Sequence, residues 1–172
     1  MPALDQRDNP LIDHLEGLAR RQDRAVLALL RKTFQVEHAL DGLAVVLPFV
    51  TRDSRWRDRA EDDALLVSAL FALHPESGSM SLPAALRVVA STSDSGSVEL
   101  RFRALLSASR QDLGEHLRHA VTLVASHGLA IDWRDLHAAI RYWDHPSDRT
   151  RREWARDFWG SAGNGEAAEN PA

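Results

Sequence analysis

The sequence contains no cysteine, only one lysine and no long apolar run. Without cysteine the chain has no disulfide, no thiol nucleophile and no thiolate metal site, which is typical of a protein from a reducing compartment. No apolar stretch approaches the roughly 20 residues that a membrane-spanning helix needs. The opening MPALDQRDNP lacks the apolar centre of a signal peptide. These absences predict a soluble, cytoplasmic protein with no membrane partner.

The motifs of common enzyme classes are also missing. There is no G-x-S-x-G, no Walker loop and no G-x-G-x-x-G, and the nine glycines are scattered. His116 and His119 lie three residues apart on a predicted helix beside Glu115, close enough to share a metal. A catalytic metal site needs a third ligand, and no H-E-x-x-H occurs. Solvent-facing helix polarity, or contact with another chain, is the favoured interpretation of this pair.

An acidic cluster precedes the most apolar segment of the chain. Asp58, Glu61, Asp62 and Asp63 could hold a divalent cation, but arginines at 55, 57 and 59 are interleaved with them. This pattern favours ion pairs within one helix. We therefore predict no catalytic residue, no metal and no cofactor, and a binding or assembly protein in place of an enzyme.

Helical periodicity and helix caps run along nearly the whole chain. With 172 residues and 44% hydrophobic content, the chain can build one compact domain or two small lobes. Apolar residues recur at helical spacing, Gly128 is a natural helix stop, and no alternating strand pattern appears. A long helix is expected to begin at Asp53 or Ser54. Other predicted helix starts follow the N-cap candidates Asn9, Asp23, Ser81, Asp132 and Ser147.

The fold class predicted from these patterns is all-α, with two packed helical bundles. The segment STSDSG at 91–96 is the strongest linker signal and separates an N-terminal lobe, 9–90, from a C-terminal bundle, 97–160. Residues 161–172 are small, polar and acidic, and are expected to form a disordered tail.

Charge limits the kind of nucleic-acid binding that is possible. The formal net charge of -4 and the pI near 6.0 exclude a protein that coats nucleic acid over its whole surface, so any anion binding must be local. Twenty of the 21 basic residues are arginine, which suits bidentate phosphate contact. A GC-rich genome also favours arginine codons, so the ratio alone decides nothing.

Two local basic clusters stand out. Residues 18–33 hold five basic side chains, with Arg31 and Lys32 at the end of a predicted helix, against one acid. Near the chain's end Arg149, Arg152 and Arg156 share one helical face, which either tracks phosphates or pairs with neighbouring acids. Trp154 and Phe158 point away from that face. Apolar stripes containing Trp133, Trp143 and Trp154 predict core packing in place of base stacking, whereas Trp56 and Trp159 are undecided.

The second half of the chain resembles the small subunit of the type I-E CRISPR Cascade complex, the CasB family. The similar stretch is RFRALLSASRQDLGEHLRHAVTLVASHGLAIDWRDLHAAIRYW, followed by an arginine-rich helix ending WARDFWG. In the first half VVLPFV, DSRWR and SLPAALR match in the same order. The resemblance covers roughly residues 10–160.

The resemblance implies a non-enzymatic, all-helical subunit that is present as a pair of copies among the other Cascade subunits and the crRNA. It implies contact with target DNA, including the displaced strand, and stabilisation of the R-loop. Replacing the DNA duplex by the guide RNA–DNA duplex is nearly balanced in free energy. Sequence-independent phosphate contacts can therefore shift this equilibrium toward the R-loop. The basic positions that match the family are Arg101, Arg110, Arg118, His119, Arg31, Lys32 and the segment containing Arg149, Arg151 and Arg152.

Two other classes of protein compete with this interpretation. One is a helical adaptor that binds only proteins, with its arginines solvated or paired. The other is a helix-turn-helix regulator, which the sequence favours less because its basic residues are spread over several helices and no recognition helix stands out.

Overall fold

The computed structural model describes residues 8–50 and 55–160, and this part of the chain is all-helical, as predicted. The helices are α1 (Pro10–Arg20), α2 (Arg24–Lys32), the 3-10 turn η1 (Val36–His38), α3 (Leu43–Val46), the 3-10 turn η2 (Leu47–Phe49), α4 (Arg57–Leu73), α5 (Leu82–Thr92), α6 (Ser95–Leu106), α7 (Leu113–Ser126), α8 (Trp133–Arg141) and α9 (Arg149–Trp159). Between these helices the described residues form no strand, only an isolated bridge from Ser77 to Ile131. No described helix is both long and apolar enough to span a bilayer.

Four of the predicted N-caps are confirmed. The Asn9 side chain accepts a hydrogen bond from the Ile12 amide, and Asp23 accepts one from Val26, each at 3.2 Å. Asp132 and Ser81 cap α8 and α5 in the same way. Each cap satisfies an amide that the first helical turn leaves without a partner, so these helix starts are encoded locally.

Two predicted helix starts differ from the structure. The last helix follows Asp148, not Ser147, and Asp148 makes no side-chain cap although it adopts a left-handed conformation with φ of 49°. The Ser147 hydroxyl instead hydrogen-bonds the ring of His145 at 2.8 Å, so it is engaged in the preceding turn. The long helix α4 begins only after Trp56. The predicted start at 53 or 54 and the predicted tail at 161–172 lie outside the described residues.

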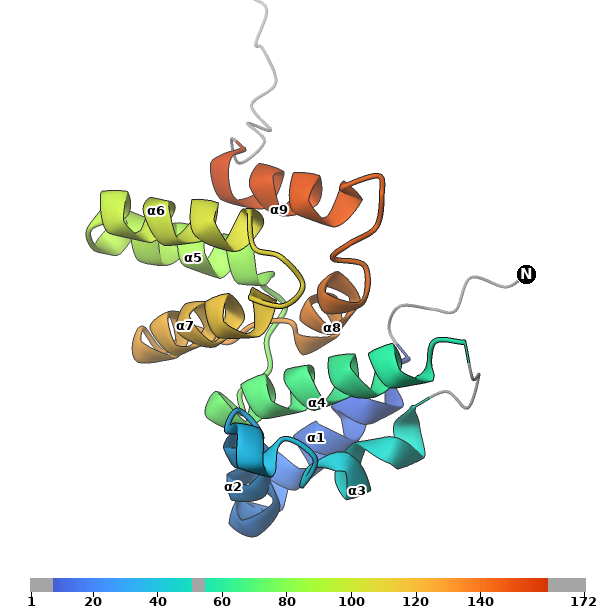
Figure 1. Ribbon diagram of the computed structural model, residues 1–172. Coiled ribbons are helices and arrows are strands. Elements are labelled where there is room, and N and C mark those ends of the chain that lie inside the picture. Colours follow the sequence, from blue (N-terminus) through green and yellow to red (C-terminus); the bar gives the residue numbers. More distant parts are fainter. Residues whose placement is uncertain (1–7, 51–54, 161–172) are drawn as a thin grey trace, which may run out of the picture.

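The helices form two packed groups, shown in Figure 1. The N-terminal helices, α1 to α4, pack around α4, which contacts each of the other three. Among the C-terminal helices, α6, α7 and α9 pack around α5, whereas α8 packs mainly against α4. The two groups meet where α7 and α8 cross α4 and where α8 is bonded to α1, and we call these contacts the junction.

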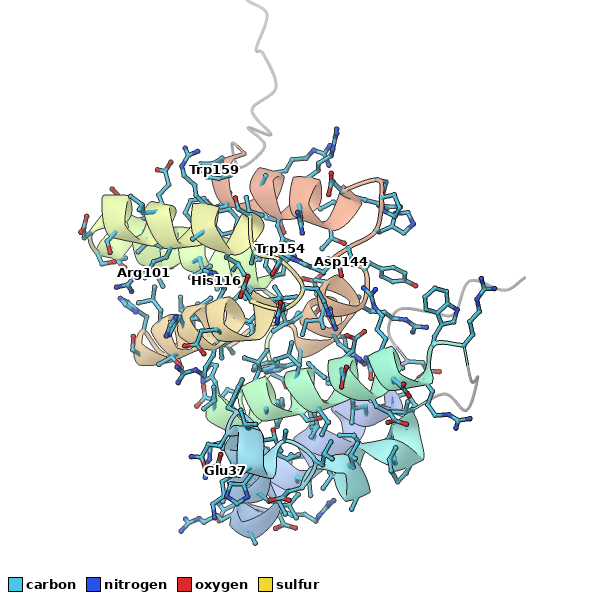
Figure 2. The ribbon with its side chains drawn as sticks, in the orientation of Figure 1. Glu37, Arg101, His116, Asp144, Trp154 and Trp159 are labelled. Atoms are coloured by element: carbon cyan, nitrogen blue, oxygen red, sulfur yellow. The ribbon has the colours of Figure 1, made fainter. Side chains whose placement is uncertain are left out.

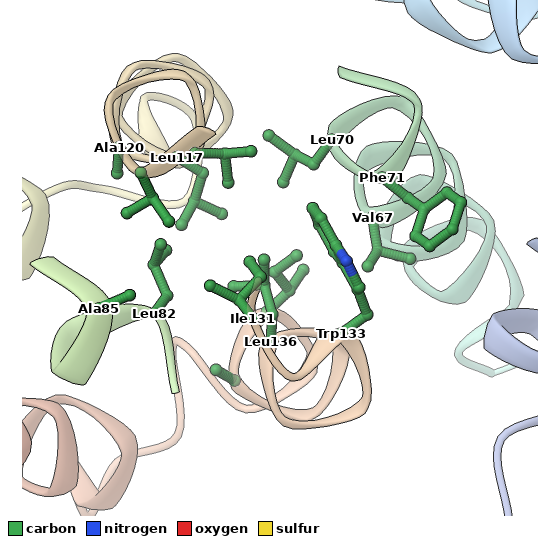
Figure 3. Close-up of a cluster of buried hydrophobic side chains, with 14 of the residues drawn as sticks. Val67, Leu70, Phe71, Leu82, Ala85, Leu117, Ala120, Ile131, Trp133 and Leu136 are labelled. Atoms are coloured by element: carbon green, nitrogen blue, oxygen red, sulfur yellow. The ribbon is translucent and has the colours of Figure 1, made fainter. Parts of the chain in front are cut away.

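A continuous apolar core crosses the junction. Figure 3 shows Trp133 of α8 between helix α4 and the residues of α5 and α7. Its ring meets Phe71 edge-on with centroids 5.3 Å apart, and its indole nitrogen donates to the Glu76 carbonyl at 2.9 Å. A buried aromatic ring contributes a large apolar contact area, and the hydrogen bond of its polar atom fixes its orientation.

The segment at 91–96 joins α5 to α6, and these two helices pack directly against each other. The predicted lobe boundary at this segment stays a prediction. The contacts of α5 with α6, α7 and α9 favour a division closer to 74–81, between α4 and α5.

Candidate nucleic-acid interface

The predicted basic residues lie in three places on the molecule. Arg31 and Lys32 end α2, a second set lies on and between α6 and α7, and the third lies on α9. In Figure 1 helices α2 and α9 lie at opposite ends of the molecule. The basic positions therefore do not converge on a single point, and a strand contacting all of them must cross both groups of helices.

The pair at the end of α2 is accessible. Arg31 donates a long hydrogen bond, 3.5 Å, to the Ala72 carbonyl. Lys32 has no ion-pair partner among the described residues. Both side chains also lie in the last turn of their helix, where the helix dipole stabilises a positive charge.

Two arginines on α6 differ in surroundings. Arg103 is paired with Glu99 at 2.6 Å, and its guanidinium lies over the Trp159 ring at 4.8 Å. Arg101 is exposed, and within the part of the chain that the structure describes its side chain has no hydrogen-bond or ion-pair partner. Residues two apart on a helix face different directions, so the structure provides a paired and an unpaired cation on the same helix.

On α7 one glutamate holds two basic residues. Glu115 pairs with Arg118 at 2.7 Å and with His119 at 3.2 Å. The hydrogen bond from Arg118 lowers the pKa of Glu115, so this carboxylate keeps its charge well below neutral pH. Both predicted positions are accessible, but part of their positive charge is balanced within the helix.

Arg110 is part of the junction. Its guanidinium forms an ion pair with the buried Asp63 of α4 and donates to the Ile140 carbonyl of α8 at 2.6 Å. Burial lowers the pKa of Arg110, and the positive charge of Arg59 lowers it further. These contacts join three segments of the fold, so they hold the helices together at this point. The role of Arg110 as a phosphate donor stays a prediction.

The arginine face of α9 is exposed as predicted. Trp154 and Phe158 are buried on the opposite side of the helix. Arg149 pairs with Glu153 at 2.8 Å, whereas Arg152 and Arg156 have no side-chain partner in the described segments. Arg149 is therefore paired with a neighbouring acid, whereas phosphate contact by Arg152 and Arg156 stays a prediction.

The buried tryptophans fill the core, as the sequence predicts. Trp133, Trp143 and Trp154 are each less than 5% exposed. Trp143 and Trp154 meet edge-on at 5.1 Å. The two undecided tryptophans remain accessible, with Trp56 57% exposed and Trp159 42% exposed.

Two members of the charged segment at 55–63 have partners outside α4. Arg59 reaches Asp144, which follows α8, at 3.3 Å, and Asp63 pairs with Arg110, so these two pairs correct the prediction of ion pairs within one helix. For the other members of the segment the pairing stays a prediction. Over residues 8–50 and 55–160, no three histidine or carboxylate side chains are grouped as metal ligands.

Arg134, which the sequence left unassigned, and Arg151, which the family resemblance placed in a basic segment, both make contacts within the fold. Arg134 of α8 pairs with Asp13 and, at 3.0 Å, with Glu16 of α1. Arg151 lies over the Trp143 ring at 5.1 Å and donates to the Ala108 carbonyl. Local sequence carries no signal for such long-range partners. Among the predicted basic positions, four are exposed and have neither a side-chain hydrogen bond nor an ion pair within the described segments, and these could hold an anion: Lys32, Arg101, Arg152 and Arg156.

Comparison with known proteins identifies the family. The model of the CRISPR-associated protein Cse2 family matches residues 23–159. A curated protein described as CRISPR-associated protein Cse2, from Thermus thermophilus, is 29% identical over 158 residues, which cover 88% of this chain and 91% of the relative.

Solved structures agree with this fold. A Cse2-family protein from Thermus thermophilus matches with a TM-score of 0.75 and 29% identity, over 88% of this chain and 97% of the other. CasB from Thermobifida fusca matches with a TM-score of 0.68 over 87% of this chain and 94% of its own, and at 21% identity it supports the fold alone.

Proposed function

Because the chain belongs to the CRISPR-associated Cse2 family, known also as CasB, we propose that it is the non-catalytic small subunit of a type I-E Cascade complex. In this role it stabilises the R-loop by holding the displaced and target DNA strands through sequence-independent arginine contacts to phosphate. Its partners are the crRNA-guided complex, the other subunits and a second copy of itself. Base pairing with the crRNA selects the target sequence, and this subunit adds binding energy that does not depend on that sequence.

One observation carries the proposal. Most arginines of the junction are tied to acids or carbonyls, but Arg101, Arg152 and Arg156 are exposed and without side-chain partners in the described residues. A guanidinium held in solvent on a helix face offers a planar pair of donors to a phosphate. Such contacts release counterions from the DNA backbone, and this gain in binding free energy does not depend on the base sequence. A net charge of -4 does not conflict with this, because the remaining surface faces protein partners.

The other predicted positions support these three. Arg31 and Lys32 extend the basic surface to the N-terminal helices, and Arg118 with His119 extends it along α7. Arg110 contributes by fixing the junction, which sets the distance between the two basic surfaces. Arg149 contributes less than its neighbours on α9 because Glu153 competes with phosphate for it.

Apolar side chains between α2 and α4 favour a protein contact elsewhere on the molecule. Val36 and Leu40 are 91% and 70% exposed, with Leu47 and Phe49 nearby in sequence and also accessible. Clustered exposed apolar residues mark surfaces that another protein covers. This is the specific observation in favour of the adaptor alternative. We assign this segment to subunit assembly, alongside nucleic-acid binding by the arginines.

The test uses one charge reversal and a matched control on the same helix. In assembled complex, Arg101→Glu is expected to shorten the lifetime of the R-loop about tenfold, since it replaces an attraction to phosphate with a repulsion. Arg103→Glu makes the same change in net charge at an arginine that already has a partner, and is expected to leave the lifetime within about twofold. Equal lifetimes for wild type and Arg101→Glu, with normal assembly, would reject the proposal.

A further inference from the structure

Helices α6 and α7 enclose a groove that the phosphate contacts alone do not explain. Its volume is about 590 Å³, within the range of about 300–1,000 Å³ that small-molecule sites occupy. Leu86 of α5 closes the groove from behind, and Val98, Leu105 and Leu123 provide further apolar lining. The groove therefore offers a non-polar surface within a polar face of the molecule.

The mouth of the groove carries cationic and imidazole side chains. Arg101 lines it from α6, and His116 and His119 line it from α7. Figure 2 shows Arg101 and His116 in the space between the two helices. Among the described residues no carboxylate lines the groove, and the Thr122 and Ser126 hydroxyls donate to carbonyls of their own helix. The groups left to donate to a ligand are therefore the Arg101 guanidinium, the His116 ring and the Nδ1 side of His119, whose Nε2 contacts Glu115.

We propose that this groove takes a nucleobase turned out of a single DNA strand, while Arg101 holds the adjacent phosphate. The inference rests on the proposed function and assigns a base-binding role to the surface between α6 and α7. The base lies against the apolar lining, and the His116 ring and the Nδ1 of His119 hydrogen-bond its edge, while the Nε2 of His119 stays with Glu115. A flat, partly apolar group linked to an anion matches a non-polar groove with a cationic mouth.

The charge of the groove favours a nucleotide over a peptide. A peptide segment carries a backbone donor and acceptor at each residue and needs both kinds of partner along its length. The lining hydroxyls donate to their own helix and keep only their lone pairs for a ligand, and the described lining offers no carboxylate to receive peptide amides, so it holds few acceptors for a peptide backbone. A nucleotide needs donors for its phosphate at the mouth and a non-polar surface for its base, and both are present.

The experiment compares an intact single-stranded oligonucleotide with one of the same length that lacks bases at several central positions. Both carry the same phosphates, so their difference reports base contacts alone. For the wild-type protein, fluorescence anisotropy is expected to show about tenfold weaker binding of the abasic strand, within the range of about 1–3 kcal/mol per base found for base contacts. This strand pair separates the inference from the proposed function, because phosphate contacts retain both strands.

A variant that fills the groove completes the test. Ala104 is exposed and lines the groove, so Ala104→Trp is expected to weaken binding of the intact strand about tenfold, to the abasic value, and to leave the abasic strand unchanged. Ala44→Trp adds the same ring on α3, away from the groove, and is expected to change neither. If Ala104→Trp unfolds, Thr122→Trp fills the groove from the other wall.

Three results would overturn the inference. Equal affinities of wild type for the intact and abasic strands would show that no base is held, while leaving phosphate binding in place. A preference for the intact strand that survives in Ala104→Trp would place the base elsewhere. Loss of assembly with unchanged DNA affinity in Ala104→Trp would assign the groove to a protein partner. Failure of both strands to bind would instead reject the proposed function.

Discussion

Arginines at the junction and arginines on the outer faces of α6 and α9 have different surroundings. At the junction Arg110 and Arg134 are half-buried, and each bonds to residues on other segments of the chain. On the outer faces Arg101, Arg152 and Arg156 are exposed and lack side-chain partners within the described structure. The same residue type therefore stabilises the fold in one region and remains available for a ligand in the other. Changes at the junction should alter stability, and changes on the outer faces should alter binding.

The largest effect is expected at Asp63 and Arg110. Arg110→Ala leaves the Asp63 carboxylate buried without its partner, and this should lower the free energy of unfolding by about 3 kcal/mol. Urea denaturation measures the change. The double variant Asp63→Leu, Arg110→Leu removes both charges and should recover most of that loss. A single variant as stable as wild type would show that this ion pair does not hold the junction.

Acid should weaken the junction through His137. Burial lowers the pKa of this α8 residue from 6.5 to about 4, with a smaller contribution from the charge of Arg141, and its ring is bonded to Asn9 of α1 at 2.8 Å. The unfolded chain then binds the proton more readily, so this stability is complete above about pH 6.5 and is lost as the pH falls toward 4. Between pH 7 and pH 5 the loss should be about 2 kcal/mol.

Chemical denaturation at the two pH values checks this prediction. His137→Gln cannot take up the proton, so the variant should lose much less stability than wild type over the same interval. An identical pH dependence in the two proteins would assign the acid sensitivity to other groups.

On the outer face of α9 the expected effect is on binding. Arg152→Gln with Arg156→Gln should reduce the dependence of log affinity on log salt by about 1.4, since each phosphate contact with a single strand contributes about 0.7. Arg149→Gln removes an arginine that is already paired with Glu153, and should change the slope much less. The melting temperatures of wild type, the double variant and Arg149→Gln should be the same. If the double variant has the same salt dependence as wild type, α9 is not part of the nucleic-acid interface.

The smallest effect is expected from releasing a paired arginine. Glu115→Gln frees Arg118 and His119 from their shared acid, and should strengthen single-strand binding about threefold, in line with the modest energy of exposed ion pairs. Anisotropy titrations at low salt measure the gain. Unchanged affinity would show that α7 does not face the nucleic acid.

Local patterns predicted the helices and their buried faces. The N-caps at Asn9 and Asp132, the stop at Gly128 and the buried Trp154 all follow from residues within one or two turns of each other. The start of α9 was misplaced by one residue because Ser147 is engaged with His145, which cap chemistry alone does not reveal.

Some arginines pair within one helical turn, as Arg103 does with Glu99, but the partners of others lie on distant segments. Arg110 and Arg101 look alike in the sequence, and only the fold brings Asp63 and Ile140 to one of them. The groove between α6 and α7 likewise depends on the separation of two helices, whereas its rim histidines were visible in the sequence only as an incomplete metal pair. Helix faces can be predicted from spacing, but partners on other helices require the packed structure.

The salt dependence of single-strand DNA affinity for the wild-type protein is the sharpest test of phosphate binding by the exposed cations. Log affinity is expected to fall with log salt with a slope of about -3, from one contact each by Lys32, Arg101, Arg152 and Arg156 at about 0.7 per phosphate. A strand long enough to cross both groups of helices is needed. Binding that is unchanged between low and physiological salt, by protein that remains folded, would contradict the claim that exposed arginines hold the phosphate backbone.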